Sequence, residues 1–279
     1  MISVIQLGTV DYATGLRLQQ RMVELRKENR IGDVLLLLEH SAVITLGRNA
    51  KRNNIVASPE VLMQRGVEVF ECDRGGDVTF HGPGQLVAYP IFDLRGFATP
   101  DGKRKTLGAV EYVRRLEEVL IRVCADFAIP AKRICGLTGV WTVSERVRLG
   151  LRPEHASETR LDSFDQDEAK IAAIGVHISR SVTSHGFALN VNTDLDYFNL
   201  IIPCGITAKP VTSMTKELGR QISLREVAHS ISRNFGMIFE SQMIWLDSLD
   251  SLLDPPVGVP LKPPDELRQM HEEEDTFWA

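Results

Sequence analysis

The chain has 279 residues, of which 43% are hydrophobic and 25% charged, and this balance is ordinary for a globular protein with a sizeable core. Its net charge of -5 disfavours a nucleic-acid or anionic-membrane surface, which needs a basic excess. No segment approaches the ~20 apolar residues that span a bilayer, and the first residues lack the pattern of a signal peptide, so we expect a cytoplasmic protein. The four cysteines show no CxxC spacing, which disfavours a zinc site or a disulfide framework.

The first third of the chain alternates short strands and helices. Apolar side chains at helical spacing predict a helix over residues 12–28 with Asp11 as its cap, and a shorter helix follows at 59–65. Two apolar runs, 33–40 and 42–46, are buried-strand candidates, and both fit the central sheet of an α/β protein. Further strands are expected at 3–7 and 67–72.

A glycine-rich stretch, RGGDVTFHGPGQLVAYP at residues 74–90, is the most distinctive part of the chain. Glycine permits positive φ and close approach of another molecule to the backbone, while Pro83 fixes the turn. The apolar run that follows, residues 86–94, is β-prone, although Pro90 is expected to place it at a sheet edge or to bend it. The stretch therefore reads as a binding loop that leads into a strand.

The second half contains two amphipathic helices and a pair of strands. Helices are predicted over 110–127, with Cys124 as a buried structural thiol, and over 224–239 with Ser223 as the cap. Strands are predicted at 138–143, 170–178 and 182–191, with a short helical turn at 194–198. The fold class is α/β (α+β), a mixed β-sheet with flanking helices.

Two segments are expected to stand apart from this domain. Residues 144–169 are polar, show no period and exceed the usual length of a connection. Residues 241–279 are rich in proline and acid, and from residue 254 onward they offer little core, so they are expected to be partly disordered. The predicted organisation is a catalytic domain over residues 1–240, containing the long loop, and a C-terminal extension over 241–279.

Three segments in order resemble one enzyme family. Residues 74–90, the segment KIAAIGV at 170–176 and the segment IPCGI at 202–206 are similar to motifs of the octanoyl-[acyl-carrier-protein]:protein N-octanoyltransferases, also called lipoyl(octanoyl) transferases. The resemblance covers roughly residues 3–239 and implies the fold of the biotin and lipoate protein ligases. The 144–169 loop is longer than the family pattern has at this place.

The resemblance implies a cysteine and a lysine as the catalytic pair. Cys204, between Pro203 and Gly205, would attack the thioester of an octanoyl group on acyl carrier protein and form an acyl-enzyme. Lys170 would be the general acid/base, partly desolvated beside that thiol. By position alone, Cys204 reads as a buried small hydrophobe and Lys170 as a surface lysine, and His81 stays open as an alternative base.

The remaining site residues are also implied by the resemblance. In that scheme, backbone amides near Gly75-Gly76 and Gly205 are plausible oxyanion donors, and strand faces such as those of Val78, Phe80 and Ile174 could supply an apolar slot for the acyl chain. The residues implied to bind substrate are Arg74, Gly75, Gly76, His81, Gly82, Gln85, Ala173, Ile174, Gly175, His185, Gly186, Ala188 and His40.

The implied reaction needs no metal, cofactor or ATP, because transfer from thioester to thioester to amide runs downhill. The acyl group would arrive on the phosphopantetheine of acyl carrier protein and leave on a lysine of the lipoyl domains of 2-oxoacid dehydrogenase-type complexes or of glycine cleavage H protein. A monomer is expected.

Two alternatives remain at this point. An ATP-dependent lipoate or biotin protein ligase would share the fold, but it needs no nucleophilic cysteine, and its nucleotide-binding loop is not evident in the sequence. A non-catalytic acyl-carrier binding module would retain the glycine loop without requiring Cys204 or Lys170.

Overall fold

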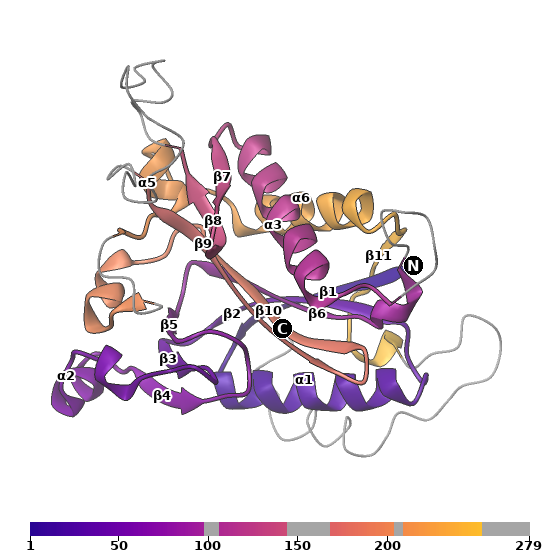
Figure 1. Ribbon diagram of the computed structural model, residues 1–279, viewed down its shortest axis with the longest axis horizontal. Helices are drawn as coiled ribbons and strands as arrows, with labels where there is room; N and C mark the ends of the chain where they lie inside the picture. Colours follow the sequence, from indigo (N-terminus) through magenta and orange to yellow (C-terminus); the bar gives the residue numbers. More distant parts are fainter. Residues whose placement is uncertain (98–105, 144–167, 204–208, 253–279) are drawn as a thin grey trace.

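The structure is a computed structural model that describes residues 1–97, 106–143, 168–203 and 209–252. An eight-stranded mixed sheet forms the centre of the molecule, and a three-stranded sheet lies beside it (Figure 1). The large sheet has the order β11-β1-β2-β6-β10-β9-β8-β7, with bounds Met243–Trp245, Ile2–Val10, Asp33–His40, Gln85–Ile91, Val182–Asn190, Lys170–Ser179, Leu137–Thr142 and Ala131–Ile134. The small sheet has the order β4-β3-β5, with bounds Glu68–Glu71, Val43–Leu46 and Val78–His81.

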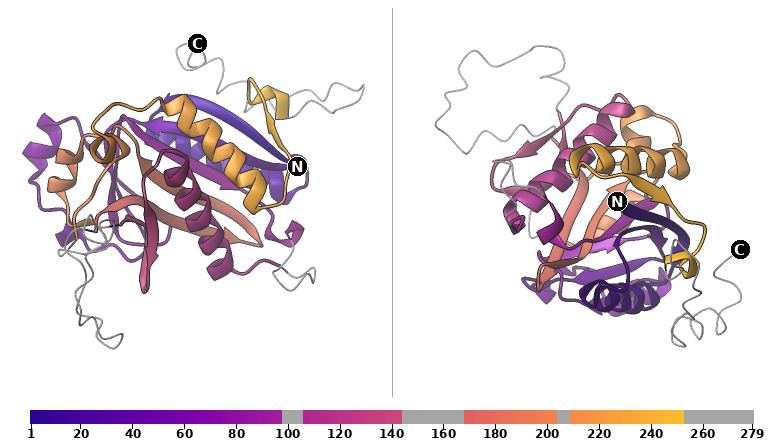
Figure 2. Two further views of the ribbon diagram at one scale, coloured as in Figure 1. Left: turned by 90° about the horizontal axis from the view of Figure 1, so that it is seen from above. Right: turned by 90° about the vertical axis from the view of Figure 1, so that its right-hand side faces the viewer.

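Helices cover both faces of the large sheet. Helix α1 (Tyr12–Lys27) lies on one face, while α3 (Ala109–Asp126) and α6 (Leu224–Ile238) lie together on the other (Figures 1 and 2). The shorter helices are α2 (Pro59–Gln64) and α5 (Met214–Leu218), and the 3-10 turns are Arg52–Asn54, Leu94–Gly96, Leu195–Leu200 and Asp250–Leu252. None of the helices in the described ranges is long and apolar enough to cross a membrane.

Strand β2 shows why the sheet needs helices on both sides. Successive side chains of a strand point to opposite faces, and all five apolar residues of β2 are buried. Leu35 and Leu37 pack into the core under α3 and α6, whereas Val34, Leu36 and Leu38 pack toward α1. The unbroken apolar run of this strand is therefore explained by burial on both faces.

The helix predictions from the sequence are confirmed, including their caps. The side chain of Asp11 accepts a hydrogen bond from the backbone N–H of Thr14, and Ser223 does the same for Glu226. These caps satisfy N–H groups that have no partner within their own helix. Cys124 is fully buried in α3, as expected for a structural thiol.

Two strand placements differ from the sequence predictions. Strand β3 belongs to the small sheet, where it pairs with β4 and β5, so the expectation that it joins the central sheet is wrong. Strand β6 is central rather than at an edge, between β2 and β10. The backbone pairing of β6 with β10 ends at Ala88, so the missing N–H of Pro90 interrupts no hydrogen bond between these two strands. The carbonyl of Pro90 accepts a hydrogen bond from the hydroxyl of Thr183 instead.

Other elements were not predicted as such. They are β5, β7, α5 and β11, all of them five residues or shorter. Strand β11 pairs in parallel with β1, so the chain just beyond residue 241 contributes to the large sheet. The domain boundary at residues 240 and 241 stays a prediction, and most of the predicted 144–169 loop and the tail from residue 253 lie outside the described residues.

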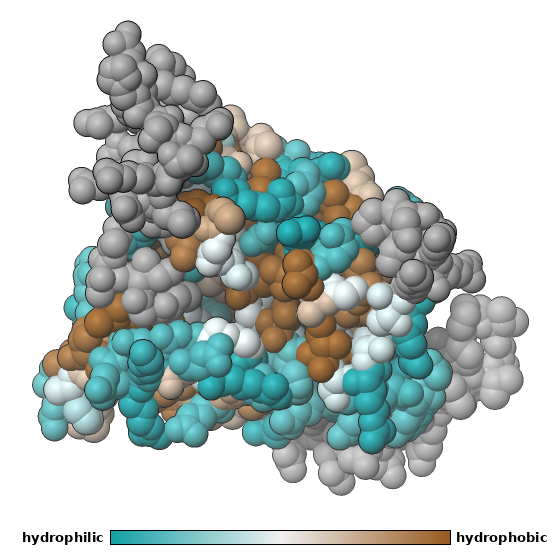
Figure 3. Space-filling model, viewed as in Figure 1, coloured by the Kyte–Doolittle hydropathy of each residue, from teal (hydrophilic) through white to brown (hydrophobic). Residues whose placement is uncertain are grey.

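The surface of the face seen in Figure 1 is not uniformly polar. Hydrophilic residues dominate its lower part, while hydrophobic residues gather near its middle, where β9 and β10 lie (Figure 3). Ile174, Val176 and Ile178 of β9 are only partly buried. This apolar area adjoins the cavity described next, because Ile174 also lines that cavity.

Candidate active site

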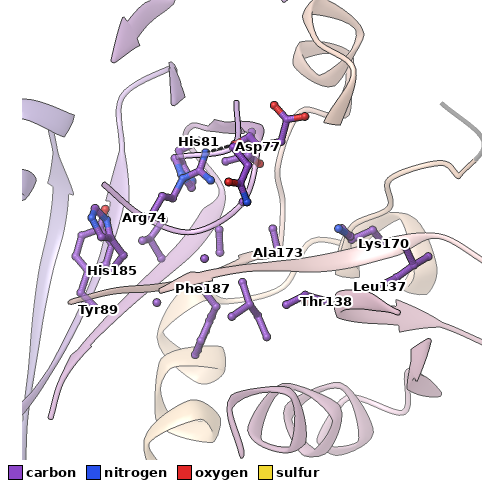
Figure 4. A pocket seen from close by; sticks show the side chains of 18 of the residues that line it. Arg74, Asp77, His81, Tyr89, Leu137, Thr138, Lys170, Ala173, His185 and Phe187 are labelled. Carbon is purple, nitrogen blue, oxygen red and sulfur yellow. Dashed lines mark hydrogen bonds between the residues drawn. The ribbon is translucent and has the colours of Figure 1, made fainter. Parts of the chain in front are cut away.

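A cavity of about 410 Å³ lies between the small sheet and the strands β9 and β10 of the large sheet (Figure 4). Its apolar wall includes Val87, Leu137, Ile174 and Phe187, and its polar residues include Arg74, His81, Lys170 and His185. Figure 4 shows Lys170, Leu137 and Thr138 at one end and His185 and Tyr89 at the other. An elongated, mostly apolar space with a few polar groups is typical of a small-molecule site.

Lys170 begins β9 and is almost buried, with 8% of its surface exposed. Its Nζ lies 4.8 Å from the centre of the Trp141 ring, at a distance suited to a cation–π contact. Gly139 of β8 has a φ of +120°, and a Cβ there would lie 2.7 Å from the carbonyl oxygen of Ala172 in β9, so glycine lets these two strands approach closely. Strand β8 thus supplies the aromatic ring against which this side chain lies in the cavity wall.

The backbone of Lys170 is bound to the chain that follows residues 204–208. Its N–H donates to the carbonyl of Pro210, and its carbonyl accepts from the N–H of Thr212, each at 2.9 Å. On the other side of that segment, Pro203 shares the wall of a small hollow with Lys170. Both described ends of the segment that contains Cys204 therefore lie at Lys170, whereas Cys204 and Gly205 themselves lie outside the described residues.

A second pair of charged groups supports the same wall. Lys209 forms an ion pair with Glu168 at 2.5 Å, and Lys132 also pairs with Glu168. The Nζ of Lys209 lies 5.5 Å from the centre of the Trp141 ring, so the amino groups of Lys170 and Lys209 both lie near one indole. Burial opposes ionisation of Glu168, but its hydrogen bonds to the two lysines outweigh this effect and lower its pKa.

Arg74 is buried and lines the cavity from the glycine-rich loop. Its guanidinium donates to the carbonyl and hydroxyl of Thr45 and to the carbonyls of Gly75 and Asp77. Among the described residues, no carboxylate lies within ion-pair distance of it. Arg74 therefore fixes the loop to β3 and places a positive charge in the cavity wall.

His81 ends β5 and also lines the cavity. Its Nδ1 lies 2.7 Å from Oε1 of Gln85. Burial, helped by the nearby His40 and Arg74, lowers the pKa of His81 to about 3. The ring is therefore neutral near pH 7.

His185 lies at the other end of the cavity with a φ of +55°. Its Nε2 lies 2.7 Å from Asp73, whose second carboxylate oxygen lies 2.5 Å from His177. Burial lowers the pKa of His185, although Asp73 acts in the opposite direction. Arg48 donates to the remaining ring nitrogen of His177, at 3.1 Å, so a chain of four polar groups runs from the cavity to the surface.

His40 lies behind the cavity rather than in its wall. It is fully buried, with Nδ1 2.7 Å from the carbonyl of Val10 and Nε2 2.6 Å from the hydroxyl of Tyr89. Burial lowers its pKa to about 4. Tyr89 lines the cavity, so His40 reaches the site through this tyrosine.

The structure brings most of the predicted site residues together. Those that line the cavity are Arg74, Gly76, His81, Lys170, Ala173, Ile174, Gly175, His185, Gly186 and Ala188. Gln85 contacts the cavity residue His81, and a Cβ on Gly82 would lie 2.5 Å from the Phe80 ring, which explains the glycine.

Two details of the sequence prediction are wrong. The N–H of Gly75 donates to the carbonyl of Val176 at 3.0 Å, so this amide is not available to an oxyanion. Val78 and Phe80 do not line the cavity, because they are buried in the core of the small sheet, where Phe80 stacks on Tyr197. The alternation of β5 turns these two side chains away from the cavity.

Several cavity residues were not singled out from the sequence. Tyr12 comes from the start of α1, and Gly136, Leu137 and Thr138 come from the turn and strand after β7. Asp73 directly precedes the glycine motif, but the sequence did not indicate its role, because its partners His177 and His185 are distant in the chain. Within the described ranges, no cluster of histidine, cysteine and acidic residues is arranged to hold a metal ion.

Comparison with known proteins identifies the class of this fold and site. The family described as the lipoyl protein ligase A/B catalytic domain matches residues 11–236. A lipoate-protein ligase A solved with ATP has a similar fold, with a TM-score of 0.62 at 14% identity over 98% of this chain and 95% of that one. A bi-partite lipoate protein ligase from Thermoplasma acidophilum gives a TM-score of 0.59 at 16% identity, over 88% of each chain. The chain belongs to the lipoyl protein ligase A/B catalytic-domain family.

Sequence relatives narrow this class. An octanoyltransferase of Koribacter versatilis is 59% identical over 274 residues, which is 98% of either chain. An octanoyltransferase of Acidobacterium capsulatum is 52% identical over 91% of this chain and 96% of its own. Within the ligase A/B family, the chain is therefore a member of the octanoyltransferases, as the sequence motifs predicted.

Proposed function

We propose that this enzyme transfers an octanoyl or lipoyl group from acyl carrier protein to the ε-amine of a lysine on lipoyl domains and on glycine cleavage H protein. The acyl chain lies in the cavity along its apolar wall, and the thioester lies at the Lys170 end. The enzyme is an acyltransferase, and the reaction is the first step of protein lipoylation.

The proposed reaction runs in two halves through Cys204 and Lys170. Lys170, in its neutral amine form, accepts the proton of the Cys204 thiol, the sulfur attacks the thioester carbonyl, and the bond to the carrier's sulfur breaks. The proton then passes to the leaving thiolate. In the second half the lysine amine attacks the Cys204 thioester, an amide forms, and the amine's proton returns the Cys204 sulfur to the thiol through Lys170.

The observation that carries this proposal is the position of Lys170. It lies in the cavity wall, the chain after the segment containing Cys204 is hydrogen-bonded to its backbone, and Pro203, before that segment, lines the same small hollow. His81, the alternative base, has a pKa of about 3 and is too weak a base to deprotonate a thiol near neutral pH. The weak basicity of His81 leaves Lys170 as the base of this proposal.

The proposed partners and conditions follow from the same scheme. The enzyme acts as a monomer in the cytoplasm and needs neither ATP nor another cofactor, because the acyl group arrives already activated as a thioester. The structural neighbours named above are ligases, and one of them was solved with ATP. The experiment therefore has to distinguish an acyltransferase from an ATP-dependent ligase.

Intact-protein mass spectrometry tests the proposal. The wild type, Cys204→Ser and Lys170→Ala are mixed with octanoyl-loaded acyl carrier protein without ATP, with Cys135→Ser and Lys51→Ala as controls at exposed positions. We expect an octanoyl adduct that hydroxylamine removes in the wild type and both controls, and none in Lys170→Ala. Delivery of octanoate to a lipoyl domain by Cys204→Ser, or a requirement for ATP, would refute the covalent mechanism.

A further inference from the structure

The side-chain amide of Asn190 in β10 is buried, and two hydrogen bonds connect it to His81 with Gln85 between them. Asn190 is 3% exposed and Gln85 is 2% exposed. The Nδ2 of Asn190 donates to the carbonyl of Thr212 at 2.9 Å, and its Oδ1 accepts from Nε2 of Gln85 at 2.9 Å. Asn190 has no part in the reaction described so far. It nevertheless connects His81 with the strand position of Lys170, because the N–H of Thr212 donates to the carbonyl of Lys170.

The hydrogen bonds of this connection have a fixed direction. A backbone carbonyl only accepts, so Thr212 selects the NH₂ group of Asn190 and turns the amide oxygen toward Gln85. Gln85 must then present its own NH₂ group, which also donates to the carbonyl of Phe80 at 3.1 Å. The oxygen of Gln85 is left facing His81, 2.7 Å from Nδ1. Since that oxygen also only accepts, Nδ1 carries the proton.

The surroundings of His81 keep the ring neutral. The charged guanidinium of Arg74, the ring of His40 at 5.9 Å and the stacked ring of Tyr12 at 6.2 Å face it, and His185 lies in the same cavity. No carboxylate of the described residues lies within ion-pair distance of the ring. A neutral imidazole with its proton on Nδ1 has a lone pair on Nε2.

We propose that Asn190 is a positioning residue for the transfer reaction: through Gln85 it fixes the proton of His81 on Nδ1, so that Nε2 offers the cavity a hydrogen-bond acceptor for an N–H group of the substrates. The inference rests on the proposed function, whose substrates carry N–H groups in the pantetheine arm and in the attacking lysine amine. An alkyl chain has no such donor, so His81 recognises the arm or the amine rather than the acyl tail.

Nitrogen NMR of the histidine rings in the full chain tests the relay directly, with the His81 signals assigned from His81→Gln. The wild type should show a protonated Nδ1 and an unprotonated Nε2 between pH 6 and 8. Asn190→Leu removes one of the two groups that orient Gln85, so a mixture of both tautomers is expected. Asn190→Asp, protonated in this buried place, reproduces both hydrogen bonds and should restore the wild-type pattern.

The two half-reactions, followed by intact mass, test the role in transfer. Asn190→Leu should slow one half by about tenfold, the loss expected for one hydrogen bond, and Asn190→Asp should recover to within about twofold. A loss confined to transfer onto the amine identifies the amine as the donor. A loss of acyl-enzyme formation from octanoyl-pantetheine, but not from the octanoyl thioester of ethanethiol, identifies the arm.

A matched control separates positioning from stability. Asn234 is equally buried, but its amide bonds to Asp126 and Ser230, away from the cavity. Asn234→Leu should lower stability without changing the His81 tautomer or either half-reaction. A wild-type His81 protonated on Nε2, or unchanged rates in Asn190→Leu despite a lost tautomer preference, would overturn the inference. If the wild type forms no acyl-enzyme, the proposed function fails while the NMR experiment still decides the relay.

Discussion

Replacing Arg74 by methionine should destabilise the protein by about 3 kcal/mol, because its guanidinium holds the glycine-rich loop. The guanidinium donates to Thr45, Gly75 and Asp77, and methionine would leave three buried or half-buried carbonyls without these donors. A hydrogen bond from a charged donor contributes about 1.5–3 kcal/mol, and an unsatisfied buried acceptor costs about 1–3 kcal/mol. Methionine also removes the cost of burying a charged group, which offsets part of the free energy lost with these hydrogen bonds, so we expect a net loss of about 3 kcal/mol.

Urea unfolding followed by circular dichroism measures this loss, with Arg48→Met as the control. Arg48 lies in the segment after β3 and is exposed, so its replacement should change the unfolding free energy by less than about 0.5 kcal/mol. If Arg74→Met lost less than about 1 kcal/mol with an unchanged m value, the hydrogen bonds of the guanidinium would not be what fixes the loop.

Three further outcomes are expected. Because burial lowers the pKa of His40 to about 4, the unfolded state binds a proton first as the pH falls below about 6.5, and up to about 3 kcal/mol of stability should be lost between pH 6.5 and 4. Urea unfolding at several pH values should show a shallower loss for His40→Gln than for the wild type, and an equally steep loss in both proteins would contradict this assignment. Gly186→Ala should lower the unfolding free energy by at least about 2 kcal/mol, since its Cβ would lie 2.1 Å from a carbonyl oxygen of β6, while Gly32→Ala, with open space around it, should change it by less than about 0.5 kcal/mol. Ala173→Leu narrows the cavity and should reduce acyl-enzyme formation from octanoyl thioester about tenfold more than from butanoyl thioester; an equal effect on both would contradict the placement of the acyl chain.

Local patterns in the sequence were sufficient for the helices and for most strands. The apolar spacing of α3 and the caps Asp11 and Ser223 act within a few residues, so they were readable without a fold. The paired strands β9 and β10 were also readable, since a short turn joins them. In contrast, β7 and β11 have four and three residues, too few for a period to stand out.

The sequence motifs also identified the family and most of the residues around the cavity, because the glycine-rich loop and β9 are each continuous in the chain. Motifs alone did not distinguish a residue in the wall from one behind it. His40 is an example, because Tyr89 lines the cavity and His40 lies behind it, hydrogen-bonded to the tyrosine hydroxyl. Val78 and Phe80 are similar cases, because the direction of β5 relative to the cavity is set by its pairing with β3.

The amino-acid sequence by itself thus determined the longer helices and most strands, the mixed α/β class and the octanoyltransferase family, since these depend on short-range periodicity, capping and contiguous motifs. Only the tertiary structure decided that β3 leaves the central sheet and that Pro90 is accommodated inside it. It also placed Gln85 against Asn190, 105 residues away, and Asp73 against His185, 112 residues away. Such contacts depend on how the sheets close around the cavity, and no local pattern carries that information, because the partners contribute nothing to each other's secondary structure.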